Sequence, residues 1–310
     1  DEWQFGPPEE SFDLLEVFYP GSVLNSIYRS PCPKEQQGWY SGTPFGQVDL
    51  LPIEAPQEVL KSYRAIVFLG WNNYNKEDFH RLLGFVKNGG TLLLARPHLN
   101  TGFRRNRPSV LPGSEVIDEL LGPDHMWSGQ PYTRNVGDGS VIYFPEDFYP
   151  SDPAIRQVYT DELISIGQSV VQYEKKRGWV RGSEHIEFAA WDWEDGGNSY
   201  RTIYLLNIDW WSDHPIHQAT LLLGEQEYRV DVERGIIGTI TLSDGYAIMP
   251  IHPLTDVLGV EKRNNGVDIT VQSTEACQLT LYLEGKDPPV QLKVPGAGIH
   301  TVSYHFNNNQ

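Results

Sequence analysis

Cysteine is scarce in this sequence, because Cys32 and Cys277 are the two thiols among 310 residues. Two cysteines can build neither a disulfide framework nor a cysteine-rich zinc site. We interpret them as unpaired thiols, and a single long-range bridge between them stays open as the alternative. The cysteines therefore do not decide between an oxidising and a reducing compartment.

Basic residues are also few, with 24 Lys and Arg against 41 Asp and Glu and a formal net charge of −17. Nucleic-acid binding needs a basic surface, so we expect no nucleic-acid partner. No apolar run approaches the roughly 20 residues of a membrane span, so we expect a soluble chain. Residues 1–4 have neither a basic nor an apolar signal region, and we expect no signal peptide in this chain. Localisation stays undetermined.

Several catalytic motifs are missing. No glycine fingerprint of dinucleotide-binding folds follows a strand, and no phosphate-binding loop occurs. The Gly-x-Ser-x-Gly elbow is absent, and neither cysteine sits in an elbow of the glutamine amidotransferase kind. We therefore expect no cofactor and find no complete catalytic set.

Aromatic residues, by contrast, are abundant, at 12% of the chain, with nine Trp and sixteen Tyr. An aromatic face can stack on the C–H face of a sugar ring, because the ring carries a negative quadrupole. This enrichment favours a carbohydrate-related role. The alternative is that the aromatic side chains fill β-sheet cores.

The first half, residues 1–177, is predicted to be an open, mostly parallel α/β domain. The buried strand Tyr63–Gly70, a helix capped by Asn75 and ended by Asn88–Gly90, and the strand Thr91–Ala95 form a βαβ unit. Further strands are predicted over Phe12–Phe18, Gln47–Ile53 and Val141–Phe144, and helices over Val23–Arg29, Glu115–Leu121 and Ile155–Tyr173.

The second half, residues 178–310, alternates polar and apolar residues at strand spacing and is predicted to form one or two antiparallel β-sandwich modules. A break near 253–261 separates the two in the second case. The predicted strands are Ile186–Trp193, Tyr200–Ile208, Gln218–Leu223, Glu227–Val232, Ile236–Leu242, Tyr246–Ile251, Val267–Ser273, Cys277–Leu283, Val290–Val294 and His300–Phe306.

Two segments follow the carboxyl ends of predicted parallel strands, where ligands bind in such sheets. The first contains Trp71 and Asn72, and the second contains Arg96 and His98. The second runs into a loop with four arginines and no acid between positions 96 and 107. Arginine suits carboxylate or sulfate groups, so these residues are candidate sugar or anion contacts. Docking against an acidic neighbour, or plain solvation, is the interpretation we favour for the arginines.

Trp191–Asp195 holds two alternating tryptophans with carboxylates between and beyond them. One interpretation is a sugar platform, with Trp191 as a contact and with Asp192 and Glu194 as an acid/base pair. Retaining glycosidases need two carboxyls about 5 Å apart, and inverting ones need somewhat more. Asp192 points away from the tryptophans in a regular strand, however, so we favour two core tryptophans with solvent-facing acids. Structural calcium near these acids stays open, although their spacing does not fit an EF-hand.

Asp209–Asp213 ends the next predicted strand and adds Asp209 as a third catalytic candidate. Trp210 and Trp211 are adjacent and point to opposite faces of a strand, so we expect one to be exposed as a sugar contact. His214 and His217 follow on a loop, and a metal ion would need further ligands. We interpret them as surface histidines and predict no metal ligands.

The succession Thr43–Pro52, Tyr63–Gly70 and Phe85–Leu93 resembles the amidotransferase-like α/β domain behind the barrel of multidomain glycosidases. β-Galactosidases with a trimerisation domain are the best-known case. The segment Arg201–Asn207 looks like the opening of the β domain that follows in such enzymes. The resemblance covers about residues 10–125 and, more loosely, 180–250.

The resemblance implies the rear portion of a glycosidase or a free-standing relative, because the family's catalytic glutamates stand on a barrel of about 250 residues that this sequence lacks. The implied partners are an oligo- or polysaccharide, a catalytic barrel domain or chain, and other copies of the chain in a homo-oligomer. By this analogy Trp71 or the 96–107 loop helps to close a sugar pocket. The alternatives are a stand-alone polysaccharide-binding protein and a self-sufficient glycosidase.

Overall fold

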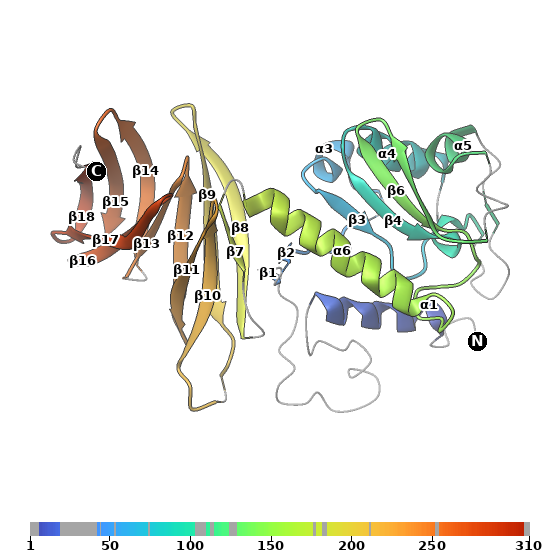
Figure 1. The fold of residues 1–310 in the computed structure, drawn as a ribbon, viewed down its shortest axis with the longest axis horizontal. Helices are drawn as coiled ribbons and strands as arrows, with labels where there is room; N and C mark the ends of the chain where they lie inside the picture. The colour runs from blue at the N-terminus through green and yellow to red at the C-terminus, as the bar shows by residue number, and fades with distance from the viewer. Residues whose placement is uncertain are drawn as a thin grey trace. The chain divides into compact units, whose positions relative to one another are not determined.

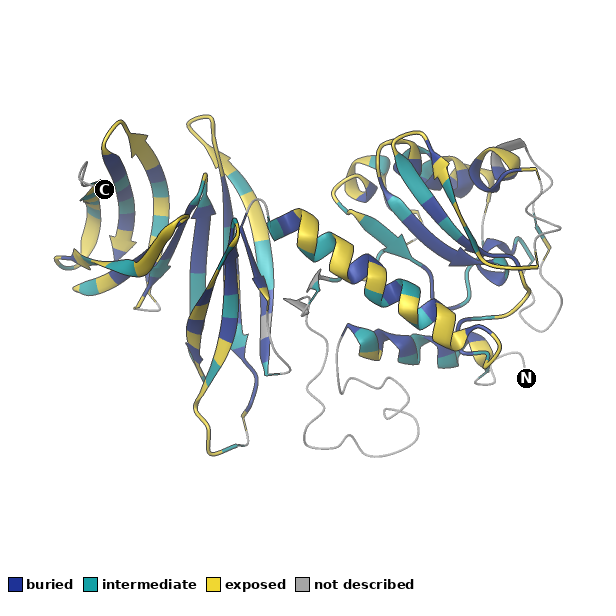
Figure 2. Cartoon of the chain, viewed as in Figure 1, coloured by how far each residue is buried: buried dark blue, intermediate teal, exposed yellow. Residues whose placement is uncertain are grey.

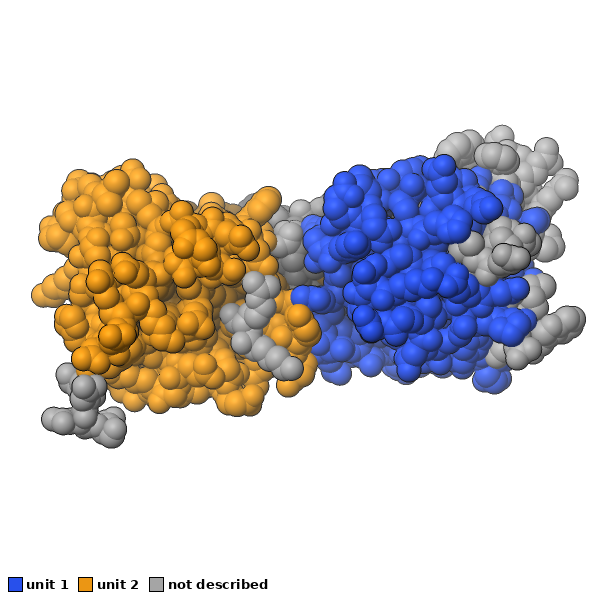
Figure 3. Space-filling view, turned by 90° about the horizontal axis from the view of Figure 1, so that it is seen from above, with its two compact units in different colours: residues 1–38, 49–170 blue, residues 39–48, 171–310 orange. Residues whose placement is uncertain are grey.

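The computed structural model describes residues 6–18, 42–43, 45–52, 54–73, 75–102, 110–111, 115–123, 129–175, 178–181, 185–210, 212–251 and 254–306. The chain divides into two compact units, residues 1–38 with 49–170 and residues 39–48 with 171–310 (Figure 3). It consists mostly of β-sheets with few helices, including one mixed sheet and several antiparallel sheets (Figure 1). In the part of the chain given above, no helix is long and apolar enough to cross a membrane.

The first unit is built on a four-stranded sheet in the order β3-β4-β6-β5. β3 (Ala65–Val67), β4 (Thr91–Ala95) and β6 (Gly139–Phe144) are parallel, and β5 (Tyr132–Val136) is antiparallel to β6. The apolar run of β4 is almost completely buried, as expected for a central parallel strand covered on both faces. The predicted βαβ unit is confirmed, and the sheet is mixed, with three parallel strands and the antiparallel strand β5.

The helix of this unit, α4 (Lys76–Lys87), begins and ends where its local signals predict. The Asn75 side chain accepts hydrogen bonds from the backbone N–H groups of Glu77 (2.8 Å) and Asp78 (3.1 Å). Asp78 in turn accepts one from the Asn75 backbone N–H at 2.8 Å, which completes a capping box. At the other end, Gly89 adopts a φ of +100°, the left-handed conformation that terminates helices.

Two predicted strands of the first unit are wrong. The segment Phe12–Phe18 lies mainly in the 3₁₀ helix η1 (Ser11–Val17), whose buried positions 11, 14, 15 and 18 have helical spacing. Of the predicted strand Gln47–Ile53, the described residues 48–52 are not in a strand, and Gln47 ends β2 (Gly46–Gln47), which pairs with β1 (Gly42–Thr43). The predicted helix 23–29 lies outside the described residues. The other helices are α1 (Pro7–Glu10), α3 (Gln57–Leu60), η2 (Arg96–Leu99), α5 (Glu115–Leu121) and α6 (Arg156–Glu174).

In the described residues, the second unit contains four antiparallel sheets, of which the two-stranded β1-β2 sheet is the smallest. A six-stranded sheet has the order β17-β16-β13-β12-β9-β8, a three-stranded sheet has the order β11-β10-β7, and another has the order β14-β15-β18. The strands of these larger sheets are β7 (Trp179–Arg181), β8 (Ile186–Asp195), β9 (Asn198–Asn207), β10 (Ile216–Leu223), β11 (Gln226–Glu233), β12 (Ile237–Ser243), β13 (Tyr246–Pro250), β14 (Thr255–Arg263), β15 (Gly266–Ser273), β16 (Cys277–Leu283), β17 (Lys286–Val294) and β18 (Gly298–His305).

The six-stranded sheet buries apolar side chains on both faces. One face packs against β7, β10 and β11 around residues such as Phe188, Leu205 and Leu221. The other face packs against β14, β15 and β18, mainly through β13, β16 and β17, with Ile248 and Leu281 at its centre. A three-stranded sheet is too narrow to cover six strands, so the second face stays partly open over β8, β9 and β12 (Figure 2).

The strands β7 and β14 were not predicted, and β14 occupies most of the segment interpreted as a break. At the edge of the six-stranded sheet, β17 contains Pro288 and Pro289. Its pairing with β16 is irregular there, between the pairs formed by Leu281 and Leu283. Neither proline has a backbone N–H, and such residues are tolerated at a sheet edge.

Candidate functional site

An exposed aromatic face lies on β8, β9 and β12, on the side of the six-stranded sheet that β14, β15 and β18 cover only in part. Trp191, Tyr204 and Ile237 are 64%, 41% and 56% exposed. The strand register places them on one face, because Trp191 pairs with Thr202, Tyr204 with Ala189, and Ile237 with Leu206. We call Trp191, Tyr204 and Ile237 the aromatic face. Large apolar side chains that gather at the surface commonly mark a binding site.

The neighbouring tryptophan, Trp193, is packed rather than free. Its ring stacks on Tyr200 with centroids 4.2 Å apart and planes 21° apart. Its indole N–H donates a hydrogen bond to the Thr202 hydroxyl at 3.0 Å. The favoured prediction of two core tryptophans is therefore correct for Trp193 and wrong for Trp191. It failed because it assumed that this face of the sheet is covered along its whole length.

The carboxylate of Asp192 points to the opposite face and is held by Arg201. The guanidinium donates to both oxygens of Asp192, at 2.6 and 2.9 Å, and to Glu174 at 2.6 Å. Arg201 also lies over the Trp179 ring, 4.8 Å from its centroid. This paired arrangement is typical of a structural ion pair. Glu194, the proposed partner of Asp192 in catalysis, is exposed near the hairpin turn.

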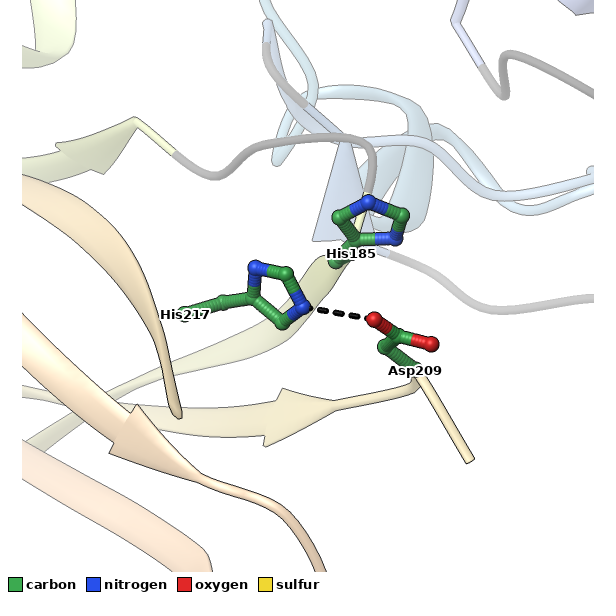
Figure 4. A group of neighbouring side chains, drawn as sticks. All are labelled: His185, Asp209 and His217. Carbon is green, nitrogen blue, oxygen red and sulfur yellow. Dashed lines mark hydrogen bonds and ion pairs between the residues drawn. The ribbon is translucent and has the colours of Figure 1, made fainter. Parts of the chain in front are cut away.

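A second cluster joins His185, Asp209 and His217, which come from separate elements of the second unit (Figure 4). His185 directly precedes β8, Asp209 lies just beyond β9, and His217 is in β10. One nitrogen of each histidine and one oxygen of Asp209 all lie within 4.8 Å of one another. The His217 Nε2 atom is 2.7 Å from Asp209 Oδ2, and the two imidazole centroids are 4.3 Å apart.

The loop after β9 fixes the Asp209 side chain in place. Ser212 donates its backbone N–H to Asp209 Oδ1 at 3.1 Å and its hydroxyl to Oδ2. Arg234 donates to the backbone carbonyls of Asp209 and Ser212, at 3.0 and 2.7 Å. The hydrogen bonds from Ser212 and His217 hold the pKa of Asp209 below its ordinary value, against the opposing effect of burial. Asp209 is thus an oriented, ionised carboxylate.

Asp209 and His217 were singled out in the sequence, but His185 was not. The signal was present, because Ile186–Trp193 and Tyr200–Ile208 were predicted as consecutive strands joined by a Gly-rich turn. Pairing them as a hairpin places the residue before the first strand beside the residues after the second. The structure shows this, since the Ile208 N–H donates to the His185 carbonyl at 2.9 Å.

The remaining candidates of the second unit are placed as follows. Trp210 is 45% exposed and follows Asp209 in the chain. Trp211 lies outside the described residues. His214, the other histidine of the predicted pair, is exposed and is not part of the cluster. A calcium site near Asp192 stays a prediction, and the candidate ligand Asp192 is engaged by Arg201.

In the first unit, the structure brings together the two segments that follow β3 and β4. The fully buried His98 ring accepts a hydrogen bond from the Ala95 N–H through Nδ1 and contacts the Leu69 carbonyl through Nε2, both at 2.9 Å. His98 thus has no ring nitrogen left for a sugar at the surface. Asn72 donates its side-chain amide to the Gly70 carbonyl at 3.1 Å.

Trp71 and Arg96 are half-buried, and the Trp71 Nε1 and Arg96 Nε atoms have no hydrogen-bond partner among the described residues. They remain candidate contacts at the carboxyl edge of this sheet. The rest of the arginine-rich loop, residues 103–109, lies outside the described part of the chain, and so do its other arginines, for which docking or solvation was the favoured interpretation.

No protein-family model and no curated protein matches the sequence. Among solved structures, the chain is similar to a catalytic mutant of Gan42B, a GH42 β-galactosidase from G. stearothermophilus. The TM-score is 0.30 at 9% identity, covering 79% of this chain and 32% of that chain. A rhamnosidase from Novosphingobium sp. PP1Y gives the same score and identity, over 79% of this chain and 29% of that one. The chain thus spans about a third of these proteins, and scores this low carry no argument about fold or chemistry.

Proposed function

We propose that this chain is a noncatalytic, carbohydrate-recognising portion of a carbohydrate-active enzyme, and that the aromatic face is its sugar contact. The observation that carries the proposal is the Trp191 ring, which is 64% exposed on a regular, rigid strand. Leaving an indole in water is unfavourable, so such a ring is expected to have an occupant. Its flat surface suits the C–H face of a pyranose.

The surroundings of Trp191 also suit a sugar. Tyr204 lies on the neighbouring strand, one pair further along the same face, close enough for both rings to contact one oligosaccharide. The hydroxyls of Thr202 and Thr239 lie on the same face and are partly accessible. Sugar binding needs polar partners beside the aromatic platform, because every ring hydroxyl that loses water must be paired.

A noncatalytic role is supported by the state of the candidate carboxylates. Asp192 is held by Arg201, and Asp209 is engaged by His217 and Ser212. The proposal therefore assigns catalysis to a barrel domain or chain. It includes contacts between copies of the chain and an amidotransferase-like assignment of the first unit, which the parallel strands β3, β4 and β6 support.

The test is affinity electrophoresis of the full chain through gels that contain galactan, xylan or a mixed-linkage glucan. We expect at least one polysaccharide to retard the chain, and Trp191→Ala to weaken that binding at least about tenfold. Tyr204→Ala should weaken it less. The matched control is Phe148→Ala, which removes an exposed aromatic ring from the first unit.

Two results would contradict the proposal. One is the absence of retardation by every polysaccharide. The other is that Trp191→Ala leaves the retardation unchanged but dissociates an oligomer in size-exclusion chromatography. In the second case the aromatic face is a contact between protein subunits and not a sugar site.

A further inference from the structure

We propose that His185, Asp209 and His217 form a binding site for a divalent transition-metal ion, with zinc as the probe. The three side chains come from the ends of β8 and β9 and from β10, and they converge on one point (Figure 4). The site is independent of the proposed sugar contact, because it uses none of the residues of the aromatic face.

The chemistry of the donors selects the metal. Two imidazoles and one carboxylate form a set that binds zinc and the neighbouring first-row ions, whereas calcium and magnesium require oxygen ligands. Three protein ligands leave a coordination position open for water or another small ligand. The two imidazole centroids are 4.3 Å apart, so both rings can present a nitrogen to one ion.

The distances fit with small side-chain adjustments. Ligand atoms around a tetrahedral zinc ion with bonds of about 2.0–2.1 Å lie about 3.3 Å apart. The His217 Nε2 and Asp209 Oδ2 atoms are 2.7 Å apart, so the ion must separate this pair slightly. The remaining separations are at most 4.8 Å, and rotation of the half-buried imidazoles can bring them to the value that the ion requires.

Hydrogen bonds within the protein already hold Asp209, the proposed ligand from the loop after β9, in position. The fully buried Asn207 donates to the carbonyls of Pro215 and Val232 and accepts from the Asp209 N–H at 3.0 Å. Ser212 and Arg234 hold the side chain and the backbone of Asp209, respectively. Such outer hydrogen bonds orient metal ligands and reduce the ordering that binding requires.

The experiment uses the full chain after treatment with a chelator. Zinc is titrated in by calorimetry, and cobalt absorption in the visible range reports the coordination geometry. We expect one zinc ion per chain and a cobalt spectrum with nitrogen and oxygen ligands. The substitutions His185→Gln and His217→Ala should each weaken zinc binding at least about tenfold.

The control is His214→Ala, which removes a nearby exposed histidine and should leave the affinity unchanged. If His217→Ala does not fold, Asp209→Asn serves instead, because the amide keeps an acceptor for Ser212. No saturable binding, or one-to-one binding that survives both His185→Gln and Asp209→Asn, would overturn the proposal. A loss of affinity in His214→Ala equal to that in His217→Ala would assign the metal to the surface loop and overturn it as well.

Discussion

The buried His98 ring is held in one neutral tautomer by its two hydrogen bonds. The Ala95 N–H donates to Nδ1, so the ring carries its proton on Nε2 and donates it to the Leu69 carbonyl. A second proton on Nδ1 would point at the Ala95 N–H, which is itself a hydrogen-bond donor, so the protonated ring is disfavoured. Burial accordingly lowers the pKa of His98 from 6.5 to about 4, although the bond to Leu69 opposes the shift.

The stability of the first unit should fall as the pH falls from 6.5 towards 4. In this window the unfolded chain binds a proton at His98 that the folded chain does not, so folding loses up to about 1.4 kcal/mol per pH unit and on the order of 3 kcal/mol in total. Above pH 6.5 the stabilisation is complete. Urea unfolding across this range measures it.

The substitution His98→Gln keeps a donor and an acceptor but cannot titrate, so it should flatten this part of the pH dependence. His80→Gln, at an exposed position of α4, is the matched control and should leave the dependence as it is. An equal pH slope in the wild type and in His98→Gln would show that another group is responsible.

Among the elements, α4 illustrates a helix whose boundary is set by side chains. The Asn75 side chain satisfies two backbone N–H groups that have no partner within the helix. Replacing Asn75 by Ala should destabilise the first unit by about 1 kcal/mol, measured by urea unfolding at neutral pH. Asn75→Ser keeps an acceptor and should lose much less. Equal losses in the two variants would mean that the packing of residue 75, and not its hydrogen bonds, matters.

Elements with local signals were the ones that the sequence predicted well. Asn75 and Gly89 mark the two ends of α4, and the buried run Thr91–Ala95 marks β4. β14 was missed because Val257 and Gly259 flank a register shift that interrupts the alternation of polar and apolar residues. The exposure of Trp191 could not be predicted, because it depends on how far a separate sheet extends across β8 and β9.

At the scale of the whole molecule, two of the three candidate catalytic carboxylates, Asp192 and Asp209, are engaged by neighbouring side chains. Asp192 is neutralised by a buried arginine that also holds Glu174. The purified chain alone should therefore not hydrolyse 4-nitrophenyl glycosides, as measured by release of nitrophenol. Turnover that Asp192→Asn abolishes would instead favour a self-sufficient glycosidase. Asp161→Asn, an exposed change on α6, is the control for such activity.

The two edges of the six-stranded sheet differ in a way that limits fibril growth. Strands alternate the direction of their N–H groups, so adjacent Pro288 and Pro289 remove one outward donor whatever the phase of β17. The missing donor disfavours the pairing of a further strand at that side. At the opposite edge, β8 lies beside β1 and β2. A proline-bearing strand at one edge and neighbouring short strands at the other both disfavour growth of this sheet by strand addition.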